Sequence, residues 1–196
     1  MTLKYKSYGI RRARLRAIVL FAVICAGVFT AQARRSLIND VSQLYANASY
    51  NDGTHTDGGG LDALIDGKAD TYWHADYASD RPMNIDYCVE ARNLGRLKSG
   101  QKLQFYFQHR NYTNDHPYEF IVYLHKAGTD FSDANYVNAG NIILANHTAA
   151  AVNTIDFTIP AMPKDSEVDG VRFVIYKYCN ENGEPAVDRQ HWFHLA

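Results

Sequence analysis

The residues with the clearest chemical potential lie in a short turn-forming segment, from Asp66 to Thr71. Asp66 supplies a carboxylate, Gly67 can adopt the positive φ that most residues avoid, and Thr71 supplies a hydroxyl and a carbonyl. A calcium ion prefers hard oxygen ligands, commonly a carboxylate, carbonyls and a hydroxyl from one tight turn. The spacing therefore fits a calcium-binding turn, and an ordinary turn without a metal is the alternative.

Signatures of catalysis are missing from the sequence. It contains no G-x-S-x-G elbow, no G-x-x-x-x-G-K-[ST] phosphate loop and no H-E-x-x-H zinc helix. The eight histidines show no tight ligand spacing, and His125 and His194 lie in strand-like runs that favour a structural role. The 21 acidic residues supply many accidental carboxylate pairs, which are weak support for glycoside hydrolysis. We therefore expect no enzyme, with a small secreted hydrolase as the rival.

Charge is distributed unevenly along the chain. The first 33 residues contain six basic residues and no acidic one, and residues 17–30 form an uncharged apolar run that ends at Ala31-Gln32-Ala33. This order of a basic, an apolar and an A-x-A segment is typical of a secretory signal peptide. A membrane anchor is the alternative, but it needs about 20 apolar residues. We predict a signal peptide over residues 1–33 and a mature domain over residues 34–196.

The mature domain is acidic. It carries 14 basic and 21 acidic residues, a net charge of −7, although the whole chain has a net charge of only −1. Nucleic-acid affinity depends largely on Lys and Arg, so a nucleic-acid partner is discounted. Its length suits one core better than two. Two cysteines remain, Cys88 and Cys179, and they form either a disulfide or two buried free thiols.

Short strands separated by turn-rich loops account for most of the mature domain. Residues 84–89 place Ile85, Tyr87 and Val89 on one face, the alternation typical of a half-buried strand. Further strand-like runs cover residues 103–108, 119–124, 154–159, 171–178 and 192–196. Several strands joined by long polar loops predict an all-β, antiparallel β-sandwich or jelly roll, with function in the loops at its ends.

Residues 63–77, with the sequence ALIDGKADTYWHADY, resemble the opening motif of the coagulation factor 5/8 type C (discoidin) family, which includes the carbohydrate-binding modules of family 32. The matching residues are Leu64, Asp66, Gly67, Asp70, Thr71, Trp73 and His74. Looser agreement follows in residues 84–89, 110–117 and 192–196, so the resemblance covers about residues 37–196. It implies a galactose-binding-like β-sandwich in which Trp73 belongs to the core.

The resemblance also implies a set of calcium ligands. They are the side chain of Asp66, both oxygens of Thr71, and the carbonyls of Ala63, Lys68 and Ala196. The family pattern adds a glutamate directly after that last alanine, but this sequence stops at Ala196. We therefore expect a closing strand that is cut short, with either a longer parent chain or a weaker calcium site.

Four residues match the sugar-binding positions of the family: His74 and Tyr77 around the first loop, and Arg110 and Asn114 in a later loop. An imidazole, a guanidinium and an amide beside one aromatic face suit the hydroxyls of a sugar. The alternative is structural, with Arg110 paired to an acidic neighbour and Tyr77 capping the core.

The resemblance implies a secreted or cell-surface module, extracellular or periplasmic, that does not catalyse a reaction. It would attach a parent enzyme or surface protein to glycans, with galactose-type sugars as candidates, and it would have no stable membrane span. The alternatives are an adhesion module for protein or lipid, and a structural accessory domain of a secreted glycoside hydrolase.

Overall fold

The computed structural model describes residues 35–47, 60–68, 70–74, 87–111 and 116–179, together with the backbone of 185–186 and 194–195. The chain divides into two compact units, Met1–Ser36 and Leu37–Ala196, and the fold below is that of the second. The predicted signal peptide over residues 1–33 lies outside the described residues. No helix within the described ranges is long and apolar enough to span a membrane.

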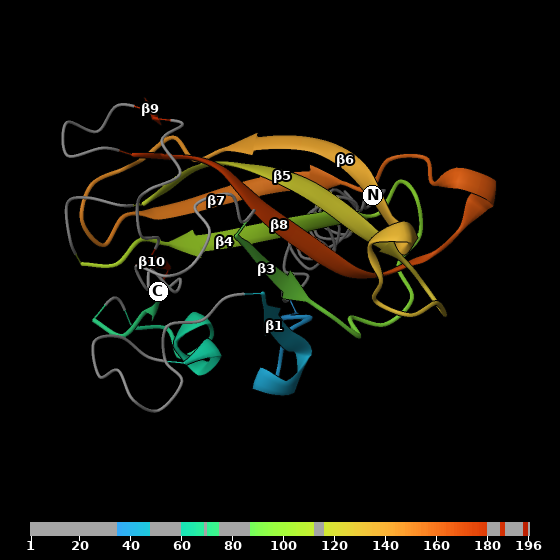
Figure 1. Ribbon diagram of the computed structural model, residues 1–196, viewed down its shortest axis with the longest axis horizontal. Helices are drawn as coiled ribbons and strands as arrows, with labels where there is room; N and C mark the ends of the chain where they lie inside the picture. The colour runs from blue at the N-terminus through green and yellow to red at the C-terminus, as the bar shows by residue number, and fades with distance from the viewer. Residues whose placement is uncertain are drawn as a thin grey trace, which may run out of the picture. The chain divides into compact units, whose positions relative to one another are not determined.

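The larger sheet is antiparallel and has the strand order β1-β3-β8-β5-β6, with β9 paired to β8 (Figure 1). Its strands are β1 (Leu44–Ala46), β3 (Cys88–Ala91), β5 (Pro117–Lys126), β6 (Tyr136–Ile143), β8 (Val168–Cys179) and β9 (Pro185–Ala186). The alternation of β5 places Phe120, Val122 and Leu124 in the core, where all three are fully buried. Apolar residues at every second position thus create the inner face of this sheet.

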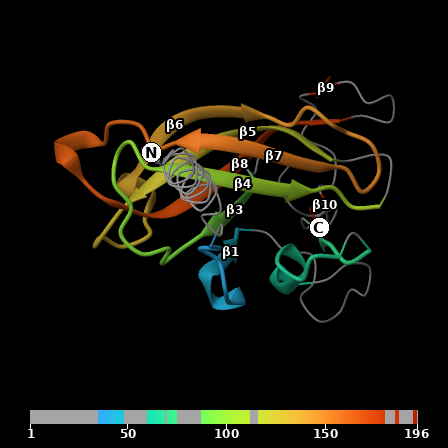
Figure 2. The ribbon, with the colours of Figure 1, turned by 180° about the vertical axis from the view of Figure 1, so that it is seen from behind.

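A second layer consists of the antiparallel pair β4 (Lys102–Gln108) and β7 (Val152–Thr158), which Figure 2 shows in front of the larger sheet. Phe105 and Phe107 of β4 contact Phe173 of β8 edge-on, with ring centroids 4.9 and 5.2 Å apart. Phe107 also stacks on Phe120 of β5 at 5.1 Å. These aromatic contacts join the two layers of the predicted sandwich.

A third pair of strands joins the opening motif to the end of the chain. β2 (Trp73–His74) pairs with β10 (His194–Leu195), and Leu195 lies opposite Trp73. Trp73 is fully buried in the core, as predicted. Four short 3₁₀ helices complete the described elements: η1 (Val41–Gln43), η2 (Leu61–Leu64), η3 (Asp133–Asn135) and η4 (Pro163–Asp165).

Most of the predicted strands are confirmed, and the run 192–196 contains β10; the short strands β1 and β9 were not predicted. The runs 103–108, 119–124, 154–159 and 171–178 correspond to β4, β5, β7 and β8, whereas the prediction at 84–89 meets β3 only at Cys88 and Val89. Strand β6 was not predicted. It lies at the edge of the sheet, and its pairing with β5 shifts register between Val122 and Tyr123, opposite Gly140 at φ 101°. A bulged, asparagine-containing edge strand lacks the alternation that identifies strands in a sequence.

The two cysteines are buried free thiols. Cys88 lies opposite Val174 on β8, and Cys179 comes five residues later on the same strand. Five strand residues span about 16 Å, whereas the Cα atoms of a disulfide lie within about 7 Å. Burial, together with the nearby Glu90 carboxylate, raises the pKa of Cys88 to about 11. The second of the two alternatives, free thiols, is therefore correct.

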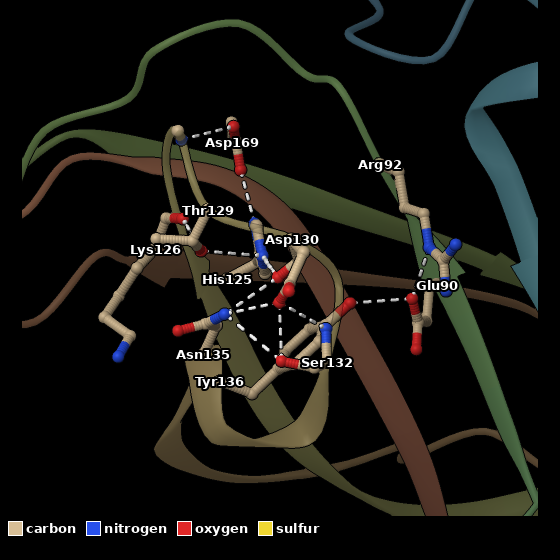
Figure 3. Close-up of polar contacts among 11 residues, drawn as sticks. Glu90, Arg92, His125, Lys126, Thr129, Asp130, Ser132, Asn135, Tyr136 and Asp169 are labelled. Carbon is tan, nitrogen blue, oxygen red and sulfur yellow. Dashed lines mark hydrogen bonds and ion pairs between the residues drawn. The ribbon is translucent and has the colours of Figure 1, made fainter.

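Glu90 is a fully buried carboxylate on β3. It accepts hydrogen bonds from Nε of Arg92 at 2.6 Å, from Nε of Arg172 at 2.6 Å and from the hydroxyl of Tyr136 at 2.7 Å. Figure 3 shows Arg92 and Tyr136 reaching the carboxylate from two sides. Tyr136 belongs to β6, Arg172 belongs to β8 and Arg92 directly follows β3, so the Glu90 carboxylate links these three segments.

His125 on β5 has the structural role that the sequence predicted. Its ring is buried, with Nδ1 2.6 Å from a carboxylate oxygen of Asp169 and Nε2 2.7 Å from the carbonyl oxygen of Asp130 (Figure 3). The ring also stacks on Phe131, with centroids 4.0 Å apart. Both ring nitrogens are therefore engaged in holding the turn after β5 against β8.

Three histidines meet at the end of the sandwich where β4 ends and β5 begins. His109 stacks on His116 with ring centroids 4.4 Å apart, and His147 lies 5.8 Å from His109. His109 is fully buried, and Asn153 lies within hydrogen-bond distance of its Nε2, at 3.2 Å. Burial, with smaller contributions from His116 and His147, lowers the pKa of His109 from 6.5 to about 3.

We expect Glu90→Gln to lower the free energy of unfolding by about 3 kcal/mol or more, because it leaves two arginines beside a buried group that has lost its charge. Denaturant unfolding at neutral pH measures the change. Glu167→Gln is the matched control, since its ion pair with Arg96, at 2.8 Å, lies at the surface. That control should cost less than about 1 kcal/mol. Equal losses in the two variants would contradict the role of Glu90.

Acid should destabilise the domain through His109. The folded state keeps this ring neutral down to about pH 3, whereas the unfolded chain protonates it near its ordinary pKa of about 6.5. Below about pH 6.5 the unfolded state therefore binds more protons than the folded state. As the pH falls further, the free energy of unfolding decreases by up to about 1.4 kcal/mol for each pH unit. Unfolding measured between about pH 7 and 5 should show a shallower pH slope in His109→Gln. An unchanged slope would exclude His109 as the source.

Candidate functional site

The Asp66 turn brings together three of the predicted calcium-ligating groups. The Thr71 hydroxyl donates to the Asp66 carboxylate at 2.5 Å and lies 3.3 Å from the carbonyl oxygen of Lys68. The Lys68 N–H donates to the other carboxylate oxygen at 2.9 Å, and Gly67 has the positive φ expected of it, 72°. The bonds from Thr71 and Lys68 lower the pKa of Asp66, so the carboxylate is ionised at neutral pH.

These groups fit the chemistry of a calcium ion. A carboxylate, a carbonyl and a hydroxyl converge in one exposed turn, and all three are the hard oxygens that calcium takes. Ala63, the next predicted ligand, is buried in η2 immediately before the turn. Ala196 lies outside the described residues, one position after Leu195 of β10. Within the described ranges, no group of three His, Cys, Asp or Glu residues is arranged to hold a metal ion.

Arg110 lies two residues after the end of β4 and over an aromatic ring of the opening motif. Its guanidinium carbon is 3.6 Å from the centre of the Tyr72 ring, and the arginine is half-buried. This is a cation–π contact, and the alternative of a pairing between Arg110 and an acidic residue stays a prediction. The contact places Arg110, from the second predicted binding loop, against the segment that leads into the first predicted binding loop.

His74 is placed differently from an exposed ligand-binding residue. Only 2% of its surface is exposed, and its ring lies 6.3 Å from that of Tyr72, at the position paired with His194. His74 and Arg110 thus have a common neighbour in Tyr72, although the imidazole itself is buried. The other two predicted residues, Tyr77 and Asn114, lie outside the described residues.

A second contact joins the same two segments. The side-chain amide of Asn111 donates to the carboxylate of Asp70 at 3.3 Å. Asn111 follows Arg110 in the sequence, and Asp70 lies two residues before Tyr72. The loop that carries Arg110 is also tied to the loop before β7, since the Ala150 N–H donates to the Arg110 carbonyl at 3.0 Å. Three loops from distant parts of the sequence therefore meet around Arg110.

Sequence reasoning did not identify Tyr72. It lies between Thr71 and Trp73, two residues that were assigned to the metal turn and the core. Period-two alternation would have placed Tyr72 on the same side as His74 and opposite Trp73. That signal was present in the sequence, but the partner of the ring, Arg110, is 38 residues away.

No family model matches the sequence, and no curated protein matches it. Solved structures are similar in fold. The module CBM32-5 of CpGH89 from Clostridium perfringens, solved in complex with GalNAc-β-1,3-galactose, has a TM-score of 0.50 at 15% identity, over 80% of this chain and 93% of that one. CBM32-3 of a family 31 glycoside hydrolase from the same organism has a TM-score of 0.50 at 16% identity, over 81% and 90% of the two chains.

A third similar structure contains the same kind of module inside a larger protein. The CBM32-1, CBM32-2 and M60 catalytic domains of Clostridium perfringens ZmpB have a TM-score of 0.51 at 16% identity, over 84% of this chain and 14% of that one. The similar structures are carbohydrate-binding modules, and two of them come from enzymes that carry a separate catalytic domain or activity. The resemblance of residues 63–77 is confirmed at the level of the fold: this chain has the antiparallel, galactose-binding-like β-sandwich of the family 32 carbohydrate-binding modules and discoidin-like domains.

Proposed function

We propose that this protein is an exported carbohydrate-binding module that attaches a parent enzyme or surface protein to glycans and catalyses no reaction itself. The observation that carries the proposal is the position of Arg110. Arg110 lies just after the end of β4, where three loops meet, and its guanidinium carbon is 3.6 Å from the centre of the Tyr72 ring in the opening motif. Loops at one end of a rigid sandwich are a common place for ligand binding.

The chemistry of this end suits a neutral sugar. A guanidinium presents planar N–H donors that match adjacent oxygen atoms, and a sugar ring offers adjacent hydroxyls. A similar module of known structure is in complex with GalNAc-β-1,3-galactose, so galactose-type glycans are the first ligands to test. We assign the contacts to Arg110, Tyr77 and Asn114. His74 is only 2% exposed and lies beside Tyr72, so we assign it a supporting role rather than a broad ligand contact of its own.

We further propose that the Asp66 turn holds a structural calcium ion. Its ligands would be the Asp66 carboxylate, the Thr71 oxygens and the carbonyls of Ala63, Lys68 and Ala196. The convergence of the Asp66, Lys68 and Thr71 oxygens supports this assignment. When bound, calcium supplies positive charge to a turn of oxygen atoms. The Asp66 carboxylate itself holds Thr71 through a hydrogen bond, and Thr71 begins the segment that leads into β2.

Removal of the Arg110 side chain should weaken glycan binding. A glycan array that includes GalNAc-β-1,3-galactose identifies the ligand, and titration calorimetry then compares the wild-type domain with Arg110→Ala. We expect the Kd to rise at least about tenfold, because hydrogen bonds to a charged group are worth about 1.5–3 kcal/mol. Arg96→Ala is the matched control: Arg96 is a mostly exposed arginine that bonds Glu167 and lies outside the proposed site. No binding to any glycan by a folded, calcium-loaded domain would exclude the proposed function.

Calcium should raise the melting temperature of the domain. At a free concentration 100 times its Kd, a ligand that binds only the folded state adds about 2.7 kcal/mol of stability. For a domain of this size the gain corresponds to a rise in Tm on the order of 5 °C or more. Melting curves in calcium and in chelator measure it. Asp66→Asn should abolish the difference, whereas Asp62→Asn, an acidic neighbour outside the ligand set, should keep it. An identical Tm in calcium and chelator for the wild type would refute the site.

A further inference from the structure

Residues 70–74 form an extended segment whose side chains alternate between two neighbours. Thr71 points to the Asp66 turn, where its hydroxyl donates to the carboxylate at 2.5 Å. Asp70 and Tyr72 contact the loop after β4 instead, through Asn111 at 3.3 Å and Arg110 at 3.6 Å. Two alternate residues of this segment, Asp70 and Tyr72, thus contact two successive residues of the loop after β4, about 40 residues later in the sequence.

The Tyr72 ring is a fixed platform. It is only 7% exposed, and the next residue, Trp73, is fully buried and paired with Leu195 of β10. A buried aromatic ring flanked by a paired strand has few orientations open to it. The plane against which the Arg110 guanidinium lies is therefore set by the fold rather than by the arginine's own rotamers.

Stacking fixes the part of an arginine that matters for recognition. The five N–H donors of a guanidinium lie in its own plane, so a ring under one face restricts the plane in which the donors point. A long arginine side chain otherwise has high rotamer entropy, which a ligand contact must overcome. A residue that orients the guanidinium beforehand strengthens binding without touching the ligand.

We propose that Tyr72 is a positioning residue for glycan binding: its ring orients the Arg110 guanidinium so that two parallel N–H donors meet vicinal hydroxyls of the sugar. This inference rests on the proposed function. It adds the residue that sequence reasoning missed, and it assigns that residue an effect exerted wholly through Arg110. Tyr72 is therefore not a ligand contact itself, and its hydroxyl has no part in the effect.

A double-mutant cycle tests this inference. Titration calorimetry measures the Kd for GalNAc-β-1,3-galactose, or for the best glycan on the array, in Tyr72→Leu, Arg110→Lys and the double variant. We expect Tyr72→Leu to raise the Kd roughly tenfold, because the guanidinium would then lose part of its rotamer freedom only on binding. Tyr72→Phe keeps the ring and should stay within about twofold of the wild type. The double variant should bind no more weakly than Arg110→Lys alone, because Tyr72 acts through the guanidinium.

Additive losses in the double variant would overturn the inference, since they would mean that Tyr72→Leu only loosens the domain. An unchanged Kd in Tyr72→Leu would overturn it equally. The matched control is Tyr45→Leu, because Tyr45 carries another arginine, Arg92, at 4.0 Å from its ring centre but lies on β1, outside the proposed site. That control should leave the Kd unchanged.

A measurement without glycan separates this inference from the proposed function. The Nε–H resonance of Arg110 in an NMR spectrum of the free domain should be displaced by the ring current of Tyr72. The displacement should persist in Tyr72→Phe and vanish in Tyr72→Leu. If no glycan binds but the resonance behaves this way, the proposed function fails while the positioning of Arg110 stands. A resonance at its ordinary position in the wild type would overturn the positioning itself.

Discussion

The packing of β4 against the larger sheet is the contact on which the rest of this domain depends. A two-stranded ribbon is marginal in water by itself, so β4 and β7 need the apolar face of β5 and β8. Phe105 and Phe107 supply that attachment through their contacts with Phe120 and Phe173. The attachment has a direct functional consequence, because β4 ends at Gln108 and the candidate ligand-binding residue Arg110 follows two residues later. The position of the guanidinium is thus determined by phenylalanines in the core.

Polar groups inside this domain add contacts between strands that also contribute to the hydrophobic core. Glu90 joins β3 to β8 and β6, and His125 holds the turn after β5 against Asp169. Both lie away from the loops around Arg110. Buried polar groups are stabilising only when all their partners are in place, and here the partners come from several strands. The framework behind the candidate site therefore forms cooperatively, which suits the fixed binding surface that the proposed function needs.

The sequence was sufficient to predict the sandwich because its apolar residues alternate. Phe105 and Phe107 on β4, or Phe120 and Val122 on β5, reveal their inner face at once. The Asp66 turn was equally predictable, since Lys68 and Thr71 lie within five residues of the carboxylate that they contact. Trp73 was assigned to the core through the family resemblance, although its strand partner Leu195 is far away in the sequence. The contact between Tyr72 and Arg110 was not, because alternation identifies a face but not what packs on it. The same holds for Glu90, whose counter-ion Arg172 lies 82 residues away, and for the meeting of His109 with His147.

Strand β6 has a consequence for how copies of this domain behave in solution. It is an edge strand of the larger sheet, beside β5. The unpaired backbone N–H and C=O groups of an edge strand can pair with a strand of another molecule. The bulge beside Gly140 twists its backbone out of line, and Asn138 and Asn141 place polar amides next to it. An irregular, polar margin of this kind is a poor template for a strand from another molecule. The edge of the sheet at β6 thus opposes pairing with a strand of another copy of this domain.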